Sequence, residues 1–369
     1  MKVLDRAREL EDSGMNVIHL EVGEPDFPTP EPIVTAARQA LDNGHTKYTP
    51  AQGIPELRQR IAAHYKSEYG VAVAPDRVFV TAGGSGALLL ATALTLNPGE
   101  GLLMTDPGYP CNANFMKSFD GEGQLVPVGP EHRYQLSASL VREHWRDNTR
   151  GVLLASPANP TGAIVDQKAL ADIASVVREK SGHFIVDEIY HGLQYGNAVV
   201  TTALEFDAIV INSFSKYFGM TGWRLGWLVV PEDAILNVEK LAQNLFICPS
   251  SIAQRAAIEA FSDRSRQIME QQRLAFEERR NLMVEGLRQL GFGVPELPGG
   301  AFYVYARLPE ALSDNSEAFC LKLLETHGIA ITPGTDFGRY EADRHVRISY
   351  ANDLPLLQEA LQRIELALS

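Results

Sequence analysis

The chain has 369 residues, of which 45% are hydrophobic, and its formal net charge at pH 7 is −13. A length and composition of this kind are typical of a globular protein with a large core and two domains. Because phosphate-rich surfaces would be repelled by the negative charge, we expect neither nucleic acid nor an anionic membrane as a partner.

The cysteines and the hydrophobic segments indicate the compartment. Cys111, Cys248 and Cys320 are odd in number and lack the spacing of metal ligands, so we expect neither a disulfide framework nor a metal site. The first residues contain no apolar run of signal-peptide length, and no later segment is long enough to span a bilayer. These features predict a cytoplasmic protein.

The N-terminal part is predicted to contain a helix over residues 1–13 and a strand over 16–20. The loop G-E-P-D-F that begins at Gly23 follows, and a glycine there lets the backbone approach a ligand closely. An ordinary connector would look the same. A second helix is expected over residues 31–43, and Tyr48 lies just beyond it in K-Y-T-P-A-Q-G, where a half-buried packing role is the commoner fate of a tyrosine.

The next motif is a strand, a glycine-rich turn and a helix. Residues 77–81 are predicted as the strand, Ala82–Gly86 as the turn and 87–96 as the helix. This order aims free backbone N–H groups and the positive end of a helix dipole at one point, which suits a phosphate. The glycines match neither a Walker loop nor a G-x-G-x-x-G fingerprint, and a turn used only for packing would have the same sequence.

Two later strands end in residues suited to a flat ligand. The strand predicted over residues 101–105 leads into D-P-G-Y-P, where Tyr109 can cover a flat ring or simply lie on the rim of a loop. After a strand over 124–128, the strand predicted over 151–155 exits through N-P-T-G. An Asn before proline is held extended, which fixes the side chain of Asn159 at the sheet edge.

An acidic residue closes the next apolar strand. Asp187 ends the run H-F-I-V-D, and a carboxylate at the end of a buried strand is costly unless a positive group meets it. A protonated ring nitrogen would be such a partner. The alternative is that Asp187 and Glu188 form a structural pair that caps the next element. Tyr190 follows three residues after Asp187.

A lysine leaves the carboxyl end of the strand predicted over residues 208–212, where open α/β sheets place their ligands. Most lysines are solvated surface charges. Here, however, the amine of Lys216 could form a Schiff base with an aldehyde cofactor, while Ser213 and Arg224 could bind an anion on the same cofactor.

The predicted strands define an α/β fold with two domains. Strands beginning near residues 77, 101, 124, 151, 184, 208 and 225 alternate with helices, which predicts a mainly parallel, seven-stranded sheet in a three-layer α/β/α large domain over residues 30–262. A long polar helix over 263–290 then connects to a smaller α+β domain. We expect that domain to span residues 263–369 and to be completed by residues 1–29.

Arg347 lies in H-V-R-I-S-Y-A, a predicted strand over residues 345–350 in which it shares a face with His345 and Ser349. An arginine on a strand is most often a charge on the solvent face.

Taken together, these motifs resemble those of the class I and II aminotransferases, which use pyridoxal 5′-phosphate (PLP). The stretch from Ser213 to Gly226 fits the lysine signature of that family, and G-E-P-D-F, N-P-T-G, D-E-x-Y and R-I-S-Y-A occur in the expected order. The resemblance covers nearly the whole chain. It implies the roles that follow for individual residues.

For the cofactor, the resemblance implies that Lys216 carries PLP and moves the substrate proton, and that Asp187 pairs with the ring nitrogen. Tyr109 would stack on the ring, and Tyr190 and Asn159 would bond its oxygen. The phosphate would be bound by Gly84, Ser85, Ser213, Arg224 and, from the neighbouring subunit of a homodimer, Tyr48. For the substrate, the family pattern implies that Gly23, Asn159 and Arg347 hold the α-carboxylate.

The expected activity is transfer of an amino group from an L-amino acid to a 2-oxo acid. A β-eliminating lyase on the same fold is the alternative, and it differs because its turnover needs no 2-oxo acid. A regulator that only senses PLP would need a DNA-binding module, for which the motifs beginning at Gly23 leave no room. Ser85 and Gly86 are uncharged where some aspartate-specific relatives place a lysine, which argues against aspartate as the substrate.

Overall fold

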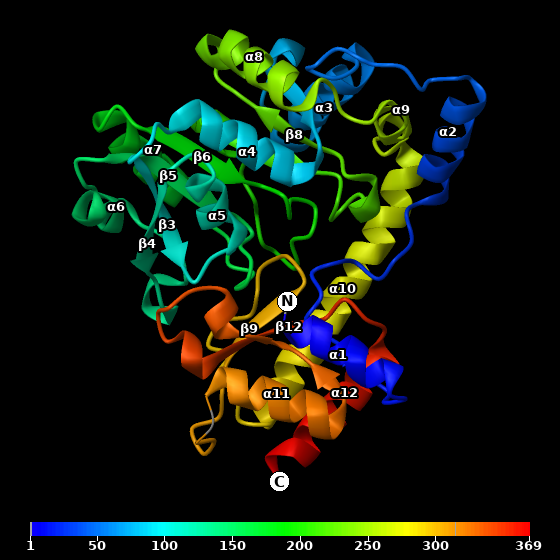
Figure 1. Ribbon diagram of the computed structural model, residues 1–369, viewed down its shortest axis with the longest axis vertical. Coiled ribbons are helices and arrows are strands. Elements are labelled where there is room, and N and C mark those ends of the chain that lie inside the picture. Colours follow the sequence, from blue (N-terminus) through cyan, green and yellow to red (C-terminus); the bar gives the residue numbers. More distant parts are fainter. Residues whose placement is uncertain (1, 314) are drawn as a thin grey trace.

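A computed structural model describes residues 2–313 and 315–369 and centres on one seven-stranded sheet (Figure 1). The strand order is β2-β8-β7-β6-β5-β3-β4. All neighbours run parallel except β8, which is antiparallel to both β2 and β7. This confirms the predicted α/β fold with a mainly parallel sheet. The strands are β2 (Val78–Thr81), β3 (Gly101–Asp106), β4 (Glu122–Pro127), β5 (Thr149–Ala155), β6 (His183–Asp187), β7 (Ile209–Ser213) and β8 (Gly226–Val229).

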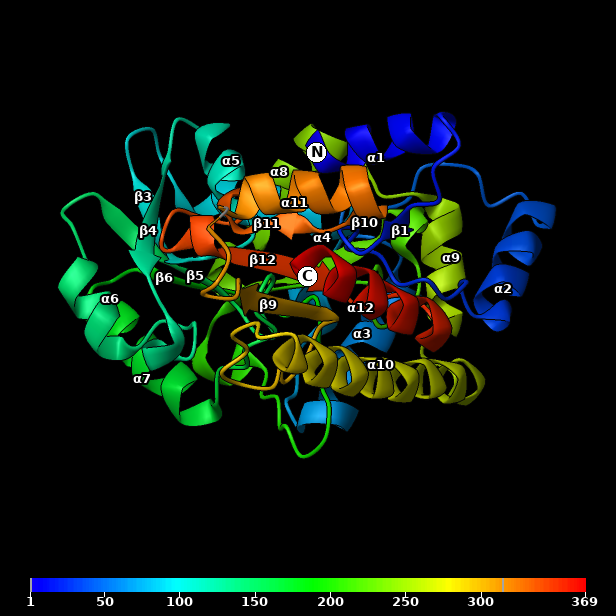
Figure 2. The ribbon, with the colours of Figure 1, turned by 90° about the horizontal axis from the view of Figure 1, so that it is seen from below.

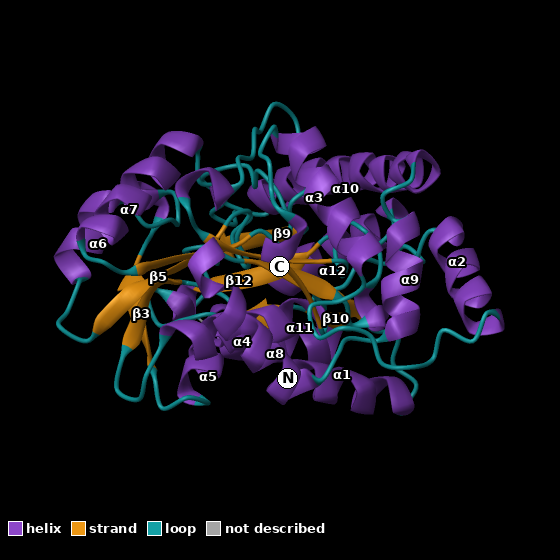
Figure 3. Cartoon of the chain, turned by 90° about the horizontal axis from the view of Figure 1, so that it is seen from above, coloured by secondary structure: helices purple, strands orange, loops and turns teal. Residues whose placement is uncertain are grey.

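Alternation along the strands produces a hydrophobic core on each face of the sheet. In β7, Ile209 and Ile211 enter one core while Val210 enters the other. The first core is covered by α4 (Gly83–Thr95), α5 (Cys111–Lys117) and α8 (Ile235–Phe246), and the second by α2 (Glu31–Asp42), α3 (Pro55–Tyr69), α6 (Ala138–His144), α7 (Gln167–Glu179) and α9 (Ser251–Glu259). Figure 3 shows the strands between these two helical layers.

The chain after α10 forms a smaller sheet, and α10 connects it to the large one. This helix, α10 (Asp263–Gln289), is 27 residues long and matches the connector predicted over 263–290. Figure 2 looks onto the small sheet, with α10 and α11 on either side. The elements are α10, β9 (Tyr303–Arg307), α11 (Ser316–His327), β11 (Thr332–Pro333), β12 (His345–Ser349) and α12 (Leu354–Leu368), with sheet order β11-β12-β9.

The N-terminal residues pack against this smaller unit. Strand β1 (Ile18–His19) pairs in parallel with β10 (Ile329–Ala330), and α1 (Lys2–Asp12) contacts α11. We therefore keep, as a proposal, the division into a large domain of residues 30–262 and a small domain of 263–369 completed by 1–29. In the part of the chain that is described, no helix is long and apolar enough to cross a membrane.

Most elements lie within one or two residues of their predicted bounds, and two differences are described here. The strand expected over residues 16–20 is only two residues long, because its partner β10 ends at Ala330 and the chain then turns to pair with β12. The glycines expected in a turn lie in the first turn of α4, which begins at Gly83 rather than at residue 87. Gly226 permits this close packing, since a Cβ there would lie 2.8 Å from the backbone nitrogen of Gly84.

Candidate active site

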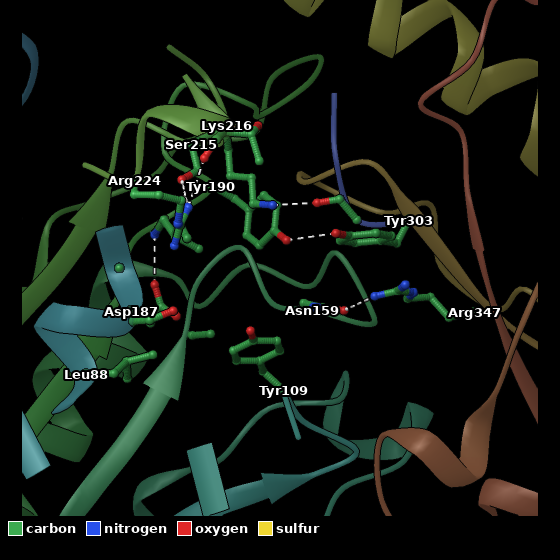
Figure 4. A pocket seen from close by; sticks show the side chains of 16 residues that line it. Leu88, Tyr109, Asn159, Asp187, Tyr190, Ser215, Lys216, Arg224, Tyr303 and Arg347 are labelled. Atoms are coloured by element: carbon green, nitrogen blue, oxygen red, sulfur yellow. Dashed lines mark hydrogen bonds between the residues drawn. The ribbon is translucent and has the colours of Figure 1, made fainter. Parts of the chain in front are cut away.

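A cavity of about 360 Å³ lies at the carboxyl ends of the central parallel strands, facing the small sheet (Figure 4). Its size suits a small organic ligand. Ten of the twelve residues singled out in the sequence line it, and the remaining two, Ser213 and Tyr48, do not. The ten are Gly23, Gly84, Ser85, Tyr109, Asn159, Asp187, Tyr190, Lys216, Arg224 and Arg347.

One end of the cavity is arranged to bind an anion. Because α4 begins at Gly83, the N–H groups of Gly84 and Ser85 have no carbonyl of their own helix to bond. The Arg224 guanidinium reaches the same point, since a Cβ on Gly83 would lie 2.5 Å from its Nη2. Arg224 Nη1 donates to the carbonyl oxygen of Thr221 at 2.9 Å and to Ser215 Oγ at 3.5 Å. Helix dipole and guanidinium therefore favour negative charge together.

Two serines near this end have different positions. Ser213, the predicted ligand, is buried behind the wall of the cavity, and its Oγ accepts the backbone N–H of Ser215 at 3.0 Å. Of these two serines, it is Ser215 that lines the cavity, and it was not among the predicted site residues. The sequence could have indicated Ser215, because it is the residue immediately before Lys216. In this structure Ser213 orients Ser215 rather than facing the cavity.

Asp187 ends β6 and is 5% exposed. Its Oδ1 accepts the backbone N–H of Ile189 at 3.0 Å, and no cationic side chain forms an ion pair with it among the described residues. Burial raises the pKa of Asp187 to about 6, which the N–H of Ile189 and the charge of Lys216 only partly offset. The carboxylate therefore lacks the positive partner that the sequence argument demanded.

Glu188, the next residue, faces away from the cavity. Its carboxylate accepts the backbone N–H of Ala203 at 2.7 Å and the hydroxyl of Thr202 at 3.0 Å. The alternative of a structural acidic pair thus describes Glu188 but not Asp187, which lines the cavity.

The amine of Lys216 lies between the two ends of the cavity and donates to the carbonyl oxygen of Gly23 at 2.5 Å. Burial, together with the nearby charges of Arg347 and Arg224, lowers the pKa of Lys216 to about 8. A lysine with this pKa is partly neutral near physiological pH. Neutral amines are nucleophiles and bases, so the position suits covalent and proton-transfer chemistry.

Two tyrosines join the loop after β6 of the large sheet to β9 of the small sheet. The hydroxyls of Tyr190 and Tyr303 lie 2.9 Å apart, and burial raises the pKa of both. Tyr303, the first residue of β9, was not among the predicted site residues. Nothing in the sequence showed that this strand pairs with the one carrying Arg347. Tyr109, on the opposite wall, is half-buried with its ring at the cavity.

The other end of the cavity is formed around Arg347. This arginine is 7% exposed, so the interpretation of a solvent-facing charge is wrong. Its Nη1 donates to Asn159 Oδ1 at 3.1 Å and its Nη2 to the carbonyl oxygen of Glu21 at 2.5 Å. Its guanidinium carbon lies 4.4 Å from the ring centre of Tyr303 and 4.7 Å from that of Phe337.

Arg347 has no carboxylate partner among the described residues, and its buried Nε has no acceptor there. A buried cation left in this state favours binding of an anion. Its planar fork suits a carboxylate in particular.

Tyr48 lies outside the cavity of its own chain. It is 82% exposed, in contrast to the half-buried packing role that is usual for tyrosine. Thr49, the next residue, is fixed by a bond from its N–H to Cys248 Sγ at 3.5 Å. The backbone is thus held while the ring projects into solvent.

The fold and the cavity define a class of protein: an α/β enzyme with a buried lysine between two arginines that line the same cavity. Comparison with known proteins is consistent with this. The family model "Aminotransferase class I and II" matches residues 15–364. The chain is 41% identical to a valine–pyruvate aminotransferase of Mycobacterium tuberculosis, covering 99% of this chain and 94% of the relative. It is 37% identical to an aspartate aminotransferase of Pyrococcus horikoshii, covering 100% and 93%.

Solved structures agree with the sequence comparisons. A crystal structure of an aminotransferase from Mycobacterium tuberculosis superposes with a TM-score of 0.96 at 40% identity, covering 99% of this chain and 95% of the other. The aspartate aminotransferase of Thermus thermophilus with maleate superposes with a TM-score of 0.93 at 34% identity, covering 99% and 95%. The chain belongs to the class I and II aminotransferases. It is an aminotransferase, and the lyase alternative is not favoured.

Proposed function

We propose that this aminotransferase binds PLP in the cavity and exchanges amino groups between an L-amino acid and a 2-oxo acid. The observation that carries the proposal is a buried lysine placed between two arginines that lack carboxylate partners among the described residues. One arginine suits the cofactor phosphate and the other the substrate carboxylate.

The residues present fit PLP. Its phosphate would be held by the N–H groups of Gly84 and Ser85 and by Arg224 and Ser215, with Ser213 positioning Ser215. Asp187, buried without a cation, fits a protonated ring nitrogen. Tyr109 fits the face of the ring, and Asn159 and Tyr190 fit its oxygen. When bound, PLP supplies an aldehyde that condenses with amines and a ring that accepts electrons from the substrate.

Separate residues of the protein would then transfer the proton, hold the charge on the ring and bind the substrate carboxylate. Lys216, with its lowered pKa, would take the proton from the substrate Cα and deliver it to the cofactor on the same face of the cofactor ring. The charge of Asp187 would keep the ring nitrogen protonated, so that the ring can accept electrons. Arg347 and Asn159 would fix the α-carboxylate, with the backbone of Gly23 beside it.

The substrate side chain is constrained by charge. The cations that line the cavity within the described residues are Lys216, Arg224 and Arg347, and all three have roles in this proposal. A single chain therefore offers no further cation for a second carboxylate, so we propose a donor with an uncharged side chain. A panel of donors that includes alanine, valine and aspartate, each with pyruvate and with 2-oxoglutarate, tests this. Turnover that needs no 2-oxo acid would instead indicate a lyase.

We also propose a homodimer with shared active sites, because the exposed Tyr48 would bond the phosphate in the neighbouring subunit. The test mixes Lys216→Ala with an inactive Tyr48 variant. Random mixing makes about half of the dimers hybrids, each with one intact site, so activity should return to about a quarter of wild type. Mixing Lys216→Ala with an inactive Arg224 variant is the control. These residues line the same cavity of one chain, so activity should stay absent; rescue there would refute the shared site.

A further inference from the structure

Asp106 connects the two domains close to the carboxylate end of the cavity. It is the last residue of β3 and is 4% exposed. Its two carboxylate oxygens accept the backbone N–H of Arg339 at 2.9 and 3.1 Å, and that of Tyr340 at 3.3 Å. Arg339 and Tyr340 belong to the loop between η6 (Gly334–Asp336) and β12, in the small domain.

The loop approaches Asp106 more closely than a side chain would allow. A Cβ on Gly338 would lie 1.8 Å from Asp106 Oδ1, so this contact depends on glycine at position 338. A second bond fixes the same loop, since the N–H of Gly108 donates to the carbonyl oxygen of Phe337 at 2.9 Å. The large domain therefore holds the backbone of residues 337–340 from two sides.

Phe337 carries this contact to Arg347. The centre of its ring lies 4.7 Å from the Arg347 guanidinium carbon, and the centre of the Tyr303 ring lies 4.4 Å from the same carbon. The stacked rings restrict the plane of the guanidinium, and that plane sets the direction in which its fork can grip a carboxylate. A neighbouring cavity of about 250 Å³, lined by residues 335–339 together with Tyr109 and Asn159, shows that the loop is also a wall of the active-site region.

We propose that Asp106 is a positioning residue for substrate carboxylate binding. It holds the loop of residues 337–340 against the large domain, and thereby keeps Phe337 stacked on Arg347. The inference rests on the proposed role of Arg347. Asp106 makes no ion pair among the described residues. Its carboxylate oxygens instead accept backbone N–H groups of the other proposed domain. Its bonds therefore depend on how the two domains are placed, rather than on the local fold of either one.

The experiment compares two substrates in the half-reaction of the PLP-loaded enzyme: an amino acid that it uses, and the amine that corresponds to it without the carboxylate. Asp106→Ala should raise the apparent KM for the amino acid about tenfold, because the loop loses charge-assisted hydrogen bonds. The rate with the amine and the PLP content should be unchanged. Phe337→Leu should show the same selective loss, and the double variant should lose no more than the larger single effect.

Further variants keep the test decisive if Asp106→Ala folds poorly. Asp106→Asn keeps the size but turns an N–H toward the loop, and Gly338→Ala pushes on the same contact from the other side. Glu277→Ala is the matched control. Glu277, in α10, accepts the backbone N–H of Gly196 at 2.8 Å and so also joins the two domains, but it does not line the cavity. It should leave the ratio of the two substrates unchanged.

Arg347→Lys, measured beside these variants, separates the possible failures. If Arg347→Lys is selective for the amino acid and the Asp106, Phe337 and Gly338 variants are not, the positioning role is wrong and the proposed carboxylate clamp remains. If Arg347→Lys itself affects amine and amino acid equally, the clamp is wrong and the positioning role falls with it. Equal losses for both substrates in the Asp106 variants would likewise overturn the positioning role.

Discussion

The two ends of the cavity each contain an arginine but are constructed differently. The Arg224 end consists of the first turn of α4 and the segment after β7, both beside the large sheet. The Arg347 end brings together Glu21, Asn159 and Tyr303 from separate parts of the chain. With the proposed domain division, the Arg224 end would form when the large domain folds, whereas the Arg347 end would need both domains in place. Variants at the two ends should fail in different ways.

The largest effect is expected between the two ends. Lys216→Ala removes the amine that both arginines influence, so turnover should fall to background while the protein stays folded. Steady-state assays together with circular dichroism check this. Substantial turnover in the folded variant would show that another group performs the chemistry.

Asp187→Asn tests the proposed cofactor end: it should impair catalysis without loss of bound PLP. The amide keeps the size of the side chain but removes the charge that would hold the ring nitrogen protonated. PLP should still bind, while proton abstraction slows by orders of magnitude. Stopped-flow half-reactions with a deuterated Cα measure that step. Near-normal rates would refute the role of Asp187.

Although Asp187→Asn should slow catalysis, it should raise the free energy of unfolding of the PLP-free protein at neutral pH. The pKa of Asp187 is raised from its ordinary 3.8 to about 6, so the folded state binds the proton more tightly than the unfolded state. Stability of the PLP-free protein should therefore fall by about 3 kcal/mol as pH rises from 4 through 6.

Because Asp187→Asn lacks this ionisation, it should be more stable than wild type at pH 7, and the difference should vanish near pH 4. Urea unfolding at both values, without PLP, measures it. An equal difference at both values would contradict the burial argument.

Arg347→Lys tests the proposed substrate end and should have a smaller effect than Lys216→Ala or Asp187→Asn. Lysine keeps the charge but loses the planar fork, at a cost of about 2 kcal/mol, so apparent affinity for amino acids should fall about thirtyfold. PLP content should stay full, unlike in an Arg224 variant. Titration of both variants with PLP, followed by substrate kinetics, distinguishes the two ends. Loss of PLP from Arg347→Lys would contradict the separate roles proposed for the Arg224 and Arg347 ends.

The sequence predicted the large sheet and most of the residues that line the cavity. Short motifs that follow a predicted strand can be placed in the fold, because the position of the strand end is known. Asp187, Asn159 and Lys216 each follow a recognisable apolar strand, and the carboxyl ends of parallel strands meet at one edge. What escaped prediction depends on contacts between distant segments. The contacts of Tyr303, Phe337 and Asp106 described above join segments that lie far apart in the sequence.

Ser213 shows a second limit. A motif gives the spacing of its residues but not which of two nearby hydroxyls turns toward the ligand, and here Ser215 lines the cavity.

The most direct test of the central claim is to locate the covalent attachment of the cofactor. The enzyme loaded with PLP is reduced with borohydride, digested and analysed by mass spectrometry. We predict one pyridoxyl group per chain, on Lys216, and its loss when an amino donor is added before reduction. A pyridoxyl group on another lysine, or reduction that leaves Lys216 unmodified, would contradict the assignment of this cavity as the active site.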